Sequence, residues 1–429
     1  MSTALIVCLI VFVLIFILRM PISLGMIAAG VGYVVVKGID MNVVGNQFIY
    51  TFFSANVIIA VPLFIFTANV MNSGKVTEMV FNFCKAISGE KPGSLGRVNV
   101  LASLVFSGMT GSAIADAAGL GKMEIEEMKK EGYDDGFSCA ITAASSTIGP
   151  IFPPSIPLVI YAMSSGASIG ALFMGGMIPA LLVVVGLMIY VSYIAKKRNY
   201  PSEKKVPFNQ FIQSTLKALP AILTPVILLL GIYTGVVTPT EAGAIAAIYA
   251  IIISMLVYRA MGPKTLCNVI LQTVKDTGAT SLMIGAATVI SFIVAREGVA
   301  TSLAELVMNI CSNKYMFLLL VNVVILILGM FIDTSTIQLV FVPIMIPMAM
   351  YFGIDLVHFG LVVTLNMMIG LSTPPFGMLL FITSGISGSS LKDVMREIMA
   401  PIGAMLVVLV VITYIPDVVL FLPKMMGLM

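Results

Sequence analysis

Two stretches of the sequence combine glycine, hydroxyl and acidic residues in the middle of long apolar segments. The first is "SGMTGSAIADAAGLG", residues 107–121, and the second is "GMFIDTST", residues 329–336. Hydroxyl and backbone carbonyl oxygens are hard ligands that suit Na⁺. A carboxylate such as that of Asp333 can accept hydrogen bonds from a solute or balance the charge of a cation. These residue types therefore indicate reversible binding of ions and polar solutes.

Two further stretches, "TIGPIFPPSIP" (Thr147–Pro157) and "MIGLSTPPFGM" (Met368–Met378), each interrupt an apolar segment near its middle. Proline removes an amide donor and clashes with the preceding turn, which frees carbonyl oxygens, and glycine lets another backbone approach closely. Freed carbonyls suit a Na⁺ ion, whereas the amino ends of half-helices suit an anion. For one such break, a kink without a ligand is the alternative. Two equivalent breaks, each opposite a Gly/Ser/Thr-rich stretch, favour a binding site.

Acidic residues inside apolar segments need a reason, because an Asp near the membrane centre costs about 2.5–3.5 kcal/mol on insertion scales. Asp333 either has a functional role or caps the half-helix that begins with "TSTIQLV". Asp116 either has a function, pairs with Lys122 or caps locally. Glu241 follows "TPT" at a helix start, which indicates a structural role. The single histidine, His358, argues against a His-based metal site or a catalytic triad.

The composition places these segments in a membrane. Of the 429 residues, 59% are hydrophobic and 10% charged, whereas a soluble domain is about 25% charged. The opening "ALIVCLIVFVLIFIL" runs into Arg19 without a small-residue cleavage site, so we expect a retained first helix. The five cysteines show neither a disulfide pattern nor metal-ligand spacing. Apolar runs long enough to span a bilayer predict crossings at residues 3–18, 21–36, 56–71, 137–162, 170–195, 218–236, 240–258, 277–295, 358–384 and 401–422.

Two segments are long, apolar and broken in the middle, residues 94–131 and 315–352, and each follows an amphipathic stretch, near 76–90 and near 299–312. We expect each broken segment to be a re-entrant hairpin that enters and leaves the membrane on one side. Such irregular backbone survives at membrane depth only where protein or a water-filled cavity covers it.

The distribution of basic residues supports both hairpins. With each hairpin returning to its own side, 19 of the 23 Lys and Arg residues fall on one side, and four fall on the other: Lys37, Arg296, Lys314 and Lys424. Counting either hairpin as a full crossing would remove this bias. The larger set is therefore predicted to be cytoplasmic, with both termini periplasmic.

The second half of the chain repeats the first. When Gly149 is aligned with Gly370 and no gap is introduced, the "PP" pair at 153–154 falls on the pair at 374–375. "PISLGMIAA" from Pro21 also resembles "PTEAGAIAA" further on, at a slightly smaller offset. Because the first hairpin would enter from the cytoplasm and the second from outside, the repeats are predicted to be inverted. Inverted repeats with discontinuous helices are the architecture of secondary transporters, with the site at the repeat interface.

The predicted fold is therefore an all-α polytopic membrane protein with two inverted repeats, re-entrant helical hairpins and discontinuous helices. We expect a first repeat over residues 1–200, a cytoplasmic linker over 201–217 and a second repeat over 218–429. The first repeat would comprise scaffold helices 1–75, an amphipathic arm 76–90, hairpin 94–131, broken helix 137–162 and helix 170–195. The second would comprise scaffold helices 218–258, an arm-type helix 299–312, hairpin 315–352, broken helix 358–384 and a last helix 401–422.

The hairpin "SGMTGSAIAD", the breaks "PIFPPSIP" and "LSTPPFG", and the repeated halves resemble the large membrane subunit of TRAP (tripartite ATP-independent periplasmic) transporters over essentially the whole chain. The resemblance implies Na⁺-driven import of a carboxylate-bearing solute across the bacterial inner membrane, with no enzymatic reaction and no nucleic-acid partner. It implies two protein partners, a periplasmic substrate-binding protein and a small four-helix membrane subunit. Because this chain starts with the large subunit's first helix, we expect the small subunit to be a separate chain. It also implies an elevator mechanism on an ion-transporter-superfamily-like fold, in which hairpins and broken helices move against the scaffold.

The resemblance further implies that the chain binds two or more Na⁺ ions as co-transported ligands. One ion site would use Ser107, Gly108 and Ser112 with Gly149, and a second would use Gly329 and Asp333 with Gly370 and Thr373. The substrate would lie between the hairpin tips and contact Ser112, Ser155 and Asp333. No arginine lies at either tip, so helix dipoles, hydroxyls and Na⁺ would neutralise the anion. The expected substrate is an acidic sugar such as sialic acid, or a C4-dicarboxylate.

Three other interpretations stay open at this point. A self-sufficient Na⁺- or H⁺-coupled carboxylate symporter would share the same plan, and only the existence of a small subunit separates the two. An intramembrane enzyme could use Asp116 and Asp333, although no paired catalytic-aspartate motif surrounds them. A channel is the third, but two dissimilar half-sites on opposite hairpins suit alternating access better.

Overall fold

The chain is almost entirely helical. The computed structural model describes residues 2–18, 20–54, 56–73, 76–88, 91–202 and 207–429, and every regular element within these ranges is a helix. The predicted all-α polytopic class is therefore confirmed. Of the basic residues counted above, Arg19, Lys75, Lys204 and Lys205 lie outside these ranges. Within the described ranges, seven helices are long and apolar enough to cross a membrane: Ile169–Lys197, Phe208–Tyr233, Pro239–Val257, Pro263–Arg296, Lys314–Phe331, Thr334–Tyr351 and Leu391–Tyr414.

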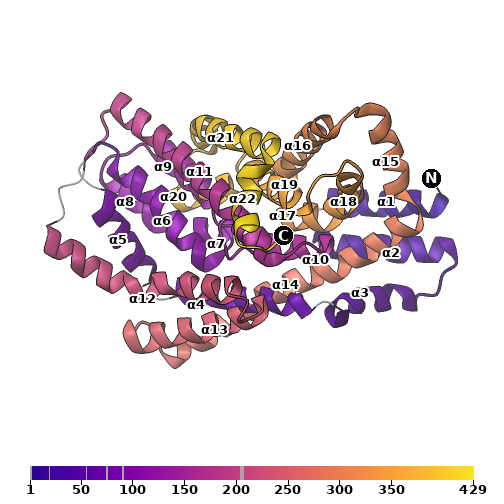
Figure 1. Cartoon of the computed structure of the whole chain (residues 1–429), viewed down its shortest axis with the longest axis horizontal. Helices are drawn as coiled ribbons and strands as arrows, with labels where there is room; N and C mark the ends of the chain where they lie inside the picture. The colour runs from indigo at the N-terminus through magenta and orange to yellow at the C-terminus, as the bar shows by residue number, and fades with distance from the viewer. Residues whose placement is uncertain (1, 19, 55, 74–75, 89–90, 203–206) are drawn as a thin grey trace.

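The helices within the predicted scaffold ranges, 1–75 and 218–258, pack on one another and on α14, along the lower and right-hand sides of the molecule in Figure 1. The helix α14 is central to this group, because it packs on α2, α3 and α4, while α1 packs on α2 and α13 packs on α4 and α12. The group consists of α1 (Thr3–Ile17), α2 (Ile22–Lys37), α3 (Asn42–Ser54), η1 (Asn56–Ile59), α4 (Ala60–Asn72), α12 (Phe208–Tyr233), α13 (Pro239–Ile252), the π-helical η2 (Ile253–Val257) and α14 (Pro263–Arg296).

The two expected hairpins and the broken helices form a second group above the first in Figure 1. The first hairpin packs on α9, the second hairpin packs on α19, and α9 also packs on α21. The elements are α6 (Ser94–Thr110), α7 (Ala113–Ala118), α8 (Leu120–Lys130), α9 (Asp135–Ser146), α10 (Ile156–Ser165), α11 (Ile169–Lys197), α16 (Lys314–Phe331), α17 (Thr334–Thr336), the π-helical η3 (Ile337–Phe341), α18 (Val342–Tyr351), α19 (Leu356–Leu371), α20 (Met378–Ser387), α21 (Leu391–Tyr414) and α22 (Pro416–Met425).

Two amphipathic helices connect the groups. The helix α5 (Val76–Ser88) packs on both α12 and α6, and α15 (Val299–Ile310) packs on both α14 and α18. The deepest part of the molecule is formed by α9 and α19. Residues 136–146 of α9 and residues 357–371 of α19 are all buried. The first helix break, which follows α9, is therefore largely covered by protein. The second break, which follows α19, is more open, because Pro375 and Phe376 are exposed.

The breaks lie where proline and glycine require them. The helix α9 ends at Ser146 because Pro150, Pro153 and Pro154 follow, and proline removes amide donors from a helix. The peptide bonds between Pro153 and Pro154 and between Pro374 and Pro375 are both cis. At the first hairpin tip, Gly111 has a φ of 59°, and a Cβ atom there would lie 2.2 Å from the carbonyl oxygen of Pro154. Only glycine combines that conformation with so close a contact.

The bounds of the helices also repeat along the chain. The alignment that places Gly149 on Gly370 also places α6 on α16, α7 with α8 on α17 through α18, and α9 on α19, each to within a few residues. It places α3, η1 and α4 together on α14, and it superimposes the two cis peptide bonds. One continuous 34-residue helix in the second half thus corresponds to an interrupted segment in the first.

Several helix ends differ from the predicted ones. The helix α12 begins at Phe208, within the predicted linker 201–217. The helix α14 begins at Pro263, whereas the predicted crossing began at residue 277. The helix α3 had not been predicted. The helix α3 and the first turns of α14 are helical, but their polar side chains lower the mean hydropathy below that of a membrane crossing. The predicted last helix, 401–422, is two helices, because α21 ends at Tyr414 and Pro416 starts α22.

Candidate functional site

A cavity of about 540 Å³ lies between the two hairpin tips. The first tip contributes Gly111 and Ser112, and the second contributes Asp333 and its neighbours in α17. The scaffold closes the opposite side with residues of α4 and α14, and Pro150 and Pro157 of the first helix break complete the wall. Five segments from different parts of the sequence thus meet at one space, which is the geometry expected for a ligand site.

The first hairpin tip rests directly on the first helix break. The amide of Ile156 donates to the carbonyl of Gly111 at 3.4 Å. A Cβ atom on Gly149 would lie 3.5 Å from the backbone of Ser112, so the two backbones are separated by little more than the width of a methyl group. The hydroxyl of Ser112 accepts a hydrogen bond from the amide of Ala115 and caps α7. The structure therefore brings together two of the predicted ion-site residues, Ser112 and Gly149, at the edge of the cavity.

The second tip also meets the second break, but through a different pair of residues. Gly329 on α16 and Gly370 on α19 are in backbone contact. The hydroxyl of Thr373 donates to the carbonyl of Ile369 at 2.6 Å. A smaller cavity of about 260 Å³ lies at this tip and is lined by Gly329 and Asp333. Of the second predicted ion set, Gly329, Gly370 and Thr373 are close to one another, and Asp333 lies between the two cavities.

Asp333 caps the returning half of the second hairpin, as one of the two interpretations of this residue required. Its carboxylate accepts hydrogen bonds from the amides of Ser335 at 2.9 Å and Thr336 at 3.1 Å, and from the hydroxyl of Thr336. Three donors on one carboxylate fix its orientation. Because the residue also lines the main cavity, the cap holds a negative charge at the cavity wall.

Three predicted residues are placed differently. Ser155 does not line the cavity; its hydroxyl donates to the carbonyl of Pro150 and accepts from the amide of Leu158, which caps α10. Ser107 is fully buried, and its hydroxyl donates to a carbonyl of its own helix. Gly108 faces the scaffold, because a Cβ atom there would lie 2.8 Å from the ring of Pro225 in α12. The structure thus groups Ser112 with Asp333 at the cavity but not with Ser155.

The scaffold side of the cavity contains polar residues that the sequence analysis missed. Asp276 of α14 accepts hydrogen bonds from the side-chain amides of Asn69 at 3.0 Å and Gln272 at 2.8 Å. Asn72 also lines the cavity. The sequence contained a signal for this wall, because the acid Asp276 and the amides Asn69 and Asn72 lie within helices that also carry long apolar runs. Among the described residues that line the cavity, Asp276 and Asp333 are charged and no Lys or Arg occurs.

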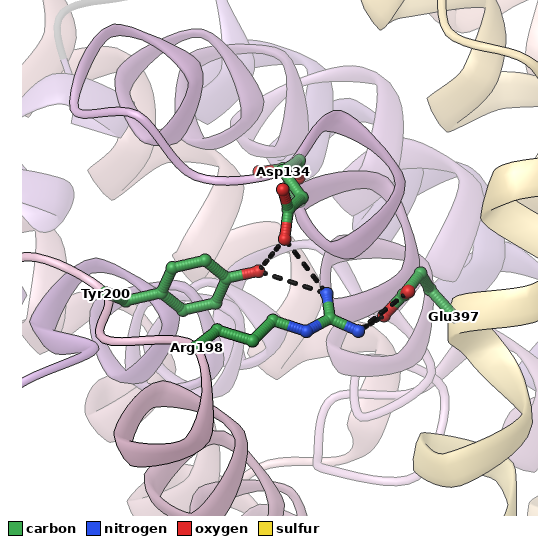
Figure 2. Close-up of polar contacts among 5 residues, drawn as sticks. Asp134, Arg198, Tyr200 and Glu397 are labelled. Carbon is green, nitrogen blue, oxygen red and sulfur yellow. Dashed lines mark hydrogen bonds and ion pairs between the residues drawn. The ribbon is translucent and has the colours of Figure 1, made fainter.

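A network of charged groups lies at the polar end of α11, away from the cavity. Figure 2 shows that Arg198 donates from one nitrogen to both carboxylate oxygens of Glu397, and from another to Asp134, which also accepts from Tyr200. The hydrogen bonds to Glu397 raise the pKa of Arg198. Burial and the hydrogen bond to Asp134 raise the pKa of Tyr200. The network ties the loop before α9 to α11 and α21.

Seven apolar helices and two helix-turn-helix tips that meet paired helix breaks around one polar cavity, all within the described residues, are the features of a polytopic membrane protein with a candidate internal site. The family described as "Tripartite ATP-independent periplasmic transporter, DctM component" matches residues 9–418. The chain therefore belongs to the DctM family of TRAP transporter large permeases.

Relatives of known name agree with this assignment. The sialic acid TRAP transporter large permease protein SiaM of Vibrio cholerae serotype O1 is 42% identical, over 86% of this chain and 86% of its own length. The sialic acid TRAP transporter permease protein SiaT of Haemophilus influenzae is 39% identical, over 99% of this chain and 69% of its own. The C4-dicarboxylate TRAP transporter large permease protein DctM of Pseudomonas aeruginosa is 36% identical, over 86% and 87%. These relatives are named as transporter permeases, so the resemblance found in the sequence is confirmed and the enzyme interpretation is dropped.

Proposed function

We propose that this chain is the large permease of a Na⁺-driven, binding-protein-dependent importer of a carboxylate-bearing solute in the bacterial inner membrane. The main observation behind the proposal is the cavity between Ser112 and Asp333. Both hairpin tips and the scaffold helices α4 and α14 contribute to its wall. A small four-helix membrane subunit and a periplasmic substrate-binding protein would complete the transporter, in keeping with the tripartite family.

Sodium ions are the proposed source of positive charge for the substrate. The cavity is lined by Asp276 and Asp333 and by no Lys or Arg among the described residues, so a bound cation would add to the helix dipoles and hydroxyls in balancing the charge of an anion. The glycine contacts at the two tips, Gly149 with Ser112 and Gly329 with Gly370, leave carbonyl oxygens close to hydroxyls, which are ligands suited to Na⁺. Two or more ions per monoanion would make import electrogenic, and each would gain about 2.3 kcal/mol per 100 mV.

The proposed movement is of an elevator type. The repeat of helix bounds between the two halves and the excess of basic residues on one side support two inverted repeats, with both termini in the periplasm. The hairpins and broken helices would carry the cavity across the membrane against the scaffold of α1–α4 and α12–α14. The amphipathic helices α5 and α15 join the two groups and would accommodate the movement.

For the substrate we propose an acidic sugar of the sialic acid class, with a C4-dicarboxylate as the second candidate. The relatives named for sialic acid are 39% and 42% identical to this chain, and one named for C4-dicarboxylates is 36% identical. The cavity offers hydroxyl groups from Thr110, Ser112 and Thr280, which suit a polyhydroxylated acid.

Uptake of labelled acids into proteoliposomes tests the proposal. The chain would be reconstituted alone, then with the small subunit, then with the binding protein added, each with and without an inward Na⁺ gradient. Uptake that needs all three proteins and Na⁺ supports the proposal and identifies the acid. Uptake by this chain alone would instead indicate a self-sufficient symporter, and uptake that is indifferent to Na⁺ would contradict the coupling.

A further inference from the structure

The part of the cavity wall that α14 contributes consists of hydrogen-bond acceptors. Asp276 and Thr280 both line the cavity, and their spacing of four residues places them on one face of the helix. One oxygen of the Asp276 carboxylate accepts from the side-chain amide of Gln272 at 2.8 Å, and the other accepts from that of Asn69 on α4 at 3.0 Å. The two scaffold donors therefore hold a negatively charged acceptor in a fixed place at the wall.

The groups beside Asp276 have already used their protons. The hydroxyl of Thr280 donates to the backbone carbonyl of Asp276 at 2.9 Å, and a hydroxyl has only one proton, so it offers lone pairs to the cavity. The side-chain nitrogen of Asn69 donates both to Asp276 and to the hydroxyl of Thr273, the latter at 3.2 Å. The α14 side of the cavity can therefore accept hydrogen bonds from a solute, but it has few protons to donate to one.

Donors are found at other parts of the wall. The hydroxyl of Ser112 at the first tip accepts from the amide of Ala115, so its proton is still free to donate. Asn72 of α4 also lines the cavity. Its amide oxygen is buried and lies 2.6 Å from where a Cβ atom on Gly119 would be, which leaves its two N–H groups as what it can offer. A solute carboxylate can thus be met by Ser112 and Asn72, but not by α14.

The acids around the cavity strengthen this asymmetry. Asp276 and Asp333 line the cavity. Asp116 is 1% exposed and lies outside the wall, and in the described structure it does not form the pair with Lys122 that the sequence allowed, because Lys122 is exposed. A carboxylate placed against Asp276 would repel it, since two like charges would share a site away from water. A hydroxyl or amide N–H group would instead donate a charge-assisted hydrogen bond to the same oxygens.

We propose that Asp276 and Thr280 of α14 form a specificity site for the solute. The site accepts hydrogen bonds from hydroxyl or amide N–H groups at the end of the solute that is remote from its carboxylate, and it rejects a second carboxylate there. The transported acid is then a monocarboxylate that is rich in donors. The inference rests on the proposed function, because the solute is that of the proposed import.

Binding to the purified full chain in lipid nanodiscs tests the specificity site with two acids. N-acetylneuraminate has one carboxylate, several hydroxyls and an amide N–H, whereas succinate has two carboxylates and neither kind of donor. Both affinities would be measured by isothermal titration calorimetry in NaCl, for the wild type and for Asp276→Asn. The matched control is Thr273→Val, because Thr273 accepts from the same side chain, Asn69, but does not line the cavity.

The ratio of the two affinities is the decisive quantity. In Asp276→Asn, the affinity for N-acetylneuraminate should fall because a charged acceptor is lost, and the affinity for succinate should rise because a repelling charge is removed. We expect the ratio to change by about tenfold or more in favour of succinate. A purely structural defect lowers both affinities together, and Thr273→Val should leave the ratio at its wild-type value.

Thr280→Val keeps the test decisive if Asp276→Asn does not fold, because the hydroxyl of Thr280 bonds only to its own helix. We expect the ratio to shift by about threefold or more toward succinate, since one neutral acceptor is lost. Thr288→Val is its control on the same helix: that hydroxyl donates in the same way, to the carbonyl of Gly285 at 2.7 Å, and lies outside the cavity wall.

Two results would overturn the specificity site. One is a wild type that does not bind N-acetylneuraminate, or that binds succinate more tightly; the other is a ratio that the variants leave unchanged. The proposed function fails differently. Na⁺-independent uptake into proteoliposomes, together with the expected shift of the ratio, would overturn only the coupling. Na⁺-dependent uptake with an unchanged ratio would overturn only the specificity site.

Discussion

Gly329 and Gly370 are in direct backbone contact, and a Cβ atom on Gly370 would lie 2.7 Å from the Cα atom of Gly329. Gly370→Ala must therefore separate α16 from α19 at the second tip. We expect a loss of about 1–3 kcal/mol in the free energy of unfolding. Thermal unfolding of the purified chain measures it, and Gly403→Ala is the control, because no atom lies within 4 Å of a Cβ there. The contact is unimportant if the two variants unfold alike.

Ser112 has a matched control in Ser168, because each caps a helix by accepting from the amide three residues ahead, at 3.4 Å and 3.3 Å. Only Ser112 lines the cavity. Ser112→Ala and Ser168→Ala should each cost roughly 1 kcal/mol of stability, whereas only Ser112→Ala should also lower uptake by tenfold or more. Equal uptake by both variants would remove Ser112 from the proposed site.

Ser155→Ala extends the same series. Ser155 caps α10 and is fully buried, but it lies outside the cavity wall. We expect a loss of stability on the scale of a cap, about 1 kcal/mol, with the apparent KM for substrate unchanged. A large rise in KM would instead restore the predicted contact between Ser155 and the substrate in another conformation of the transporter.

The bidentate pair of Arg198 and Glu397 is part-buried, with side-chain exposures of 30% and 18%. A double-mutant cycle with Arg198→Gln and Glu397→Gln should give a coupling free energy of about 1 kcal/mol. Lys130 with Glu127 is the control, since that pair is more exposed and lies on one helix. Equal coupling in the two cycles would mean that the network does not hold α11 against α21.

Glu297 provides a pH prediction. Hydrogen bonds, first of all from Lys37, lower the pKa of Glu297 to about 2. A carboxyl group with a lowered pKa in the folded state stabilises above its unfolded pKa, and this contribution disappears as the pH falls through the folded value. The difference in thermal midpoint between the wild type and Glu297→Gln should therefore be greatest above about pH 5 and shrink toward about pH 2. A difference that is constant with pH would contradict this account.

The sequence predicted the all-helical class and the positions at which proline and glycine interrupt the helices, because proline, glycine and hydropathy act locally. The re-entrant course of the two hairpins stays a prediction. The hydropathy pattern missed α3 and the first turns of α14 for one reason: Asn46 and Gln47 in the first half, and Gln272 with Lys275 in the second, reduce hydropathy without preventing a helix. Asp276 was overlooked because the predicted crossing began one residue after it.

The orientations of side chains within a hairpin are set by tertiary packing and could not be predicted. Asp116 and Ser112 are four residues apart on the sequence, yet one faces the interior of the hairpin and the other faces the cavity. The cap at Asp333 was one of the two interpretations that the sequence allowed, because a cap depends only on the residues that directly follow it.

The length of α14 restricts where Asp276 can lie across a membrane. Its 34 residues extend for about 51 Å at 1.5 Å per residue, whereas the hydrocarbon core of a bilayer is about 30 Å thick. The stretch of this helix from Asp276 to Arg296 is itself about 30 Å long. With Arg296 at one surface of the hydrocarbon, Asp276 reaches the other, beside Lys275. On the topology proposed above, which places Lys275 on the cytoplasmic side, the cavity wall that Asp276 forms would lie toward that side of the membrane.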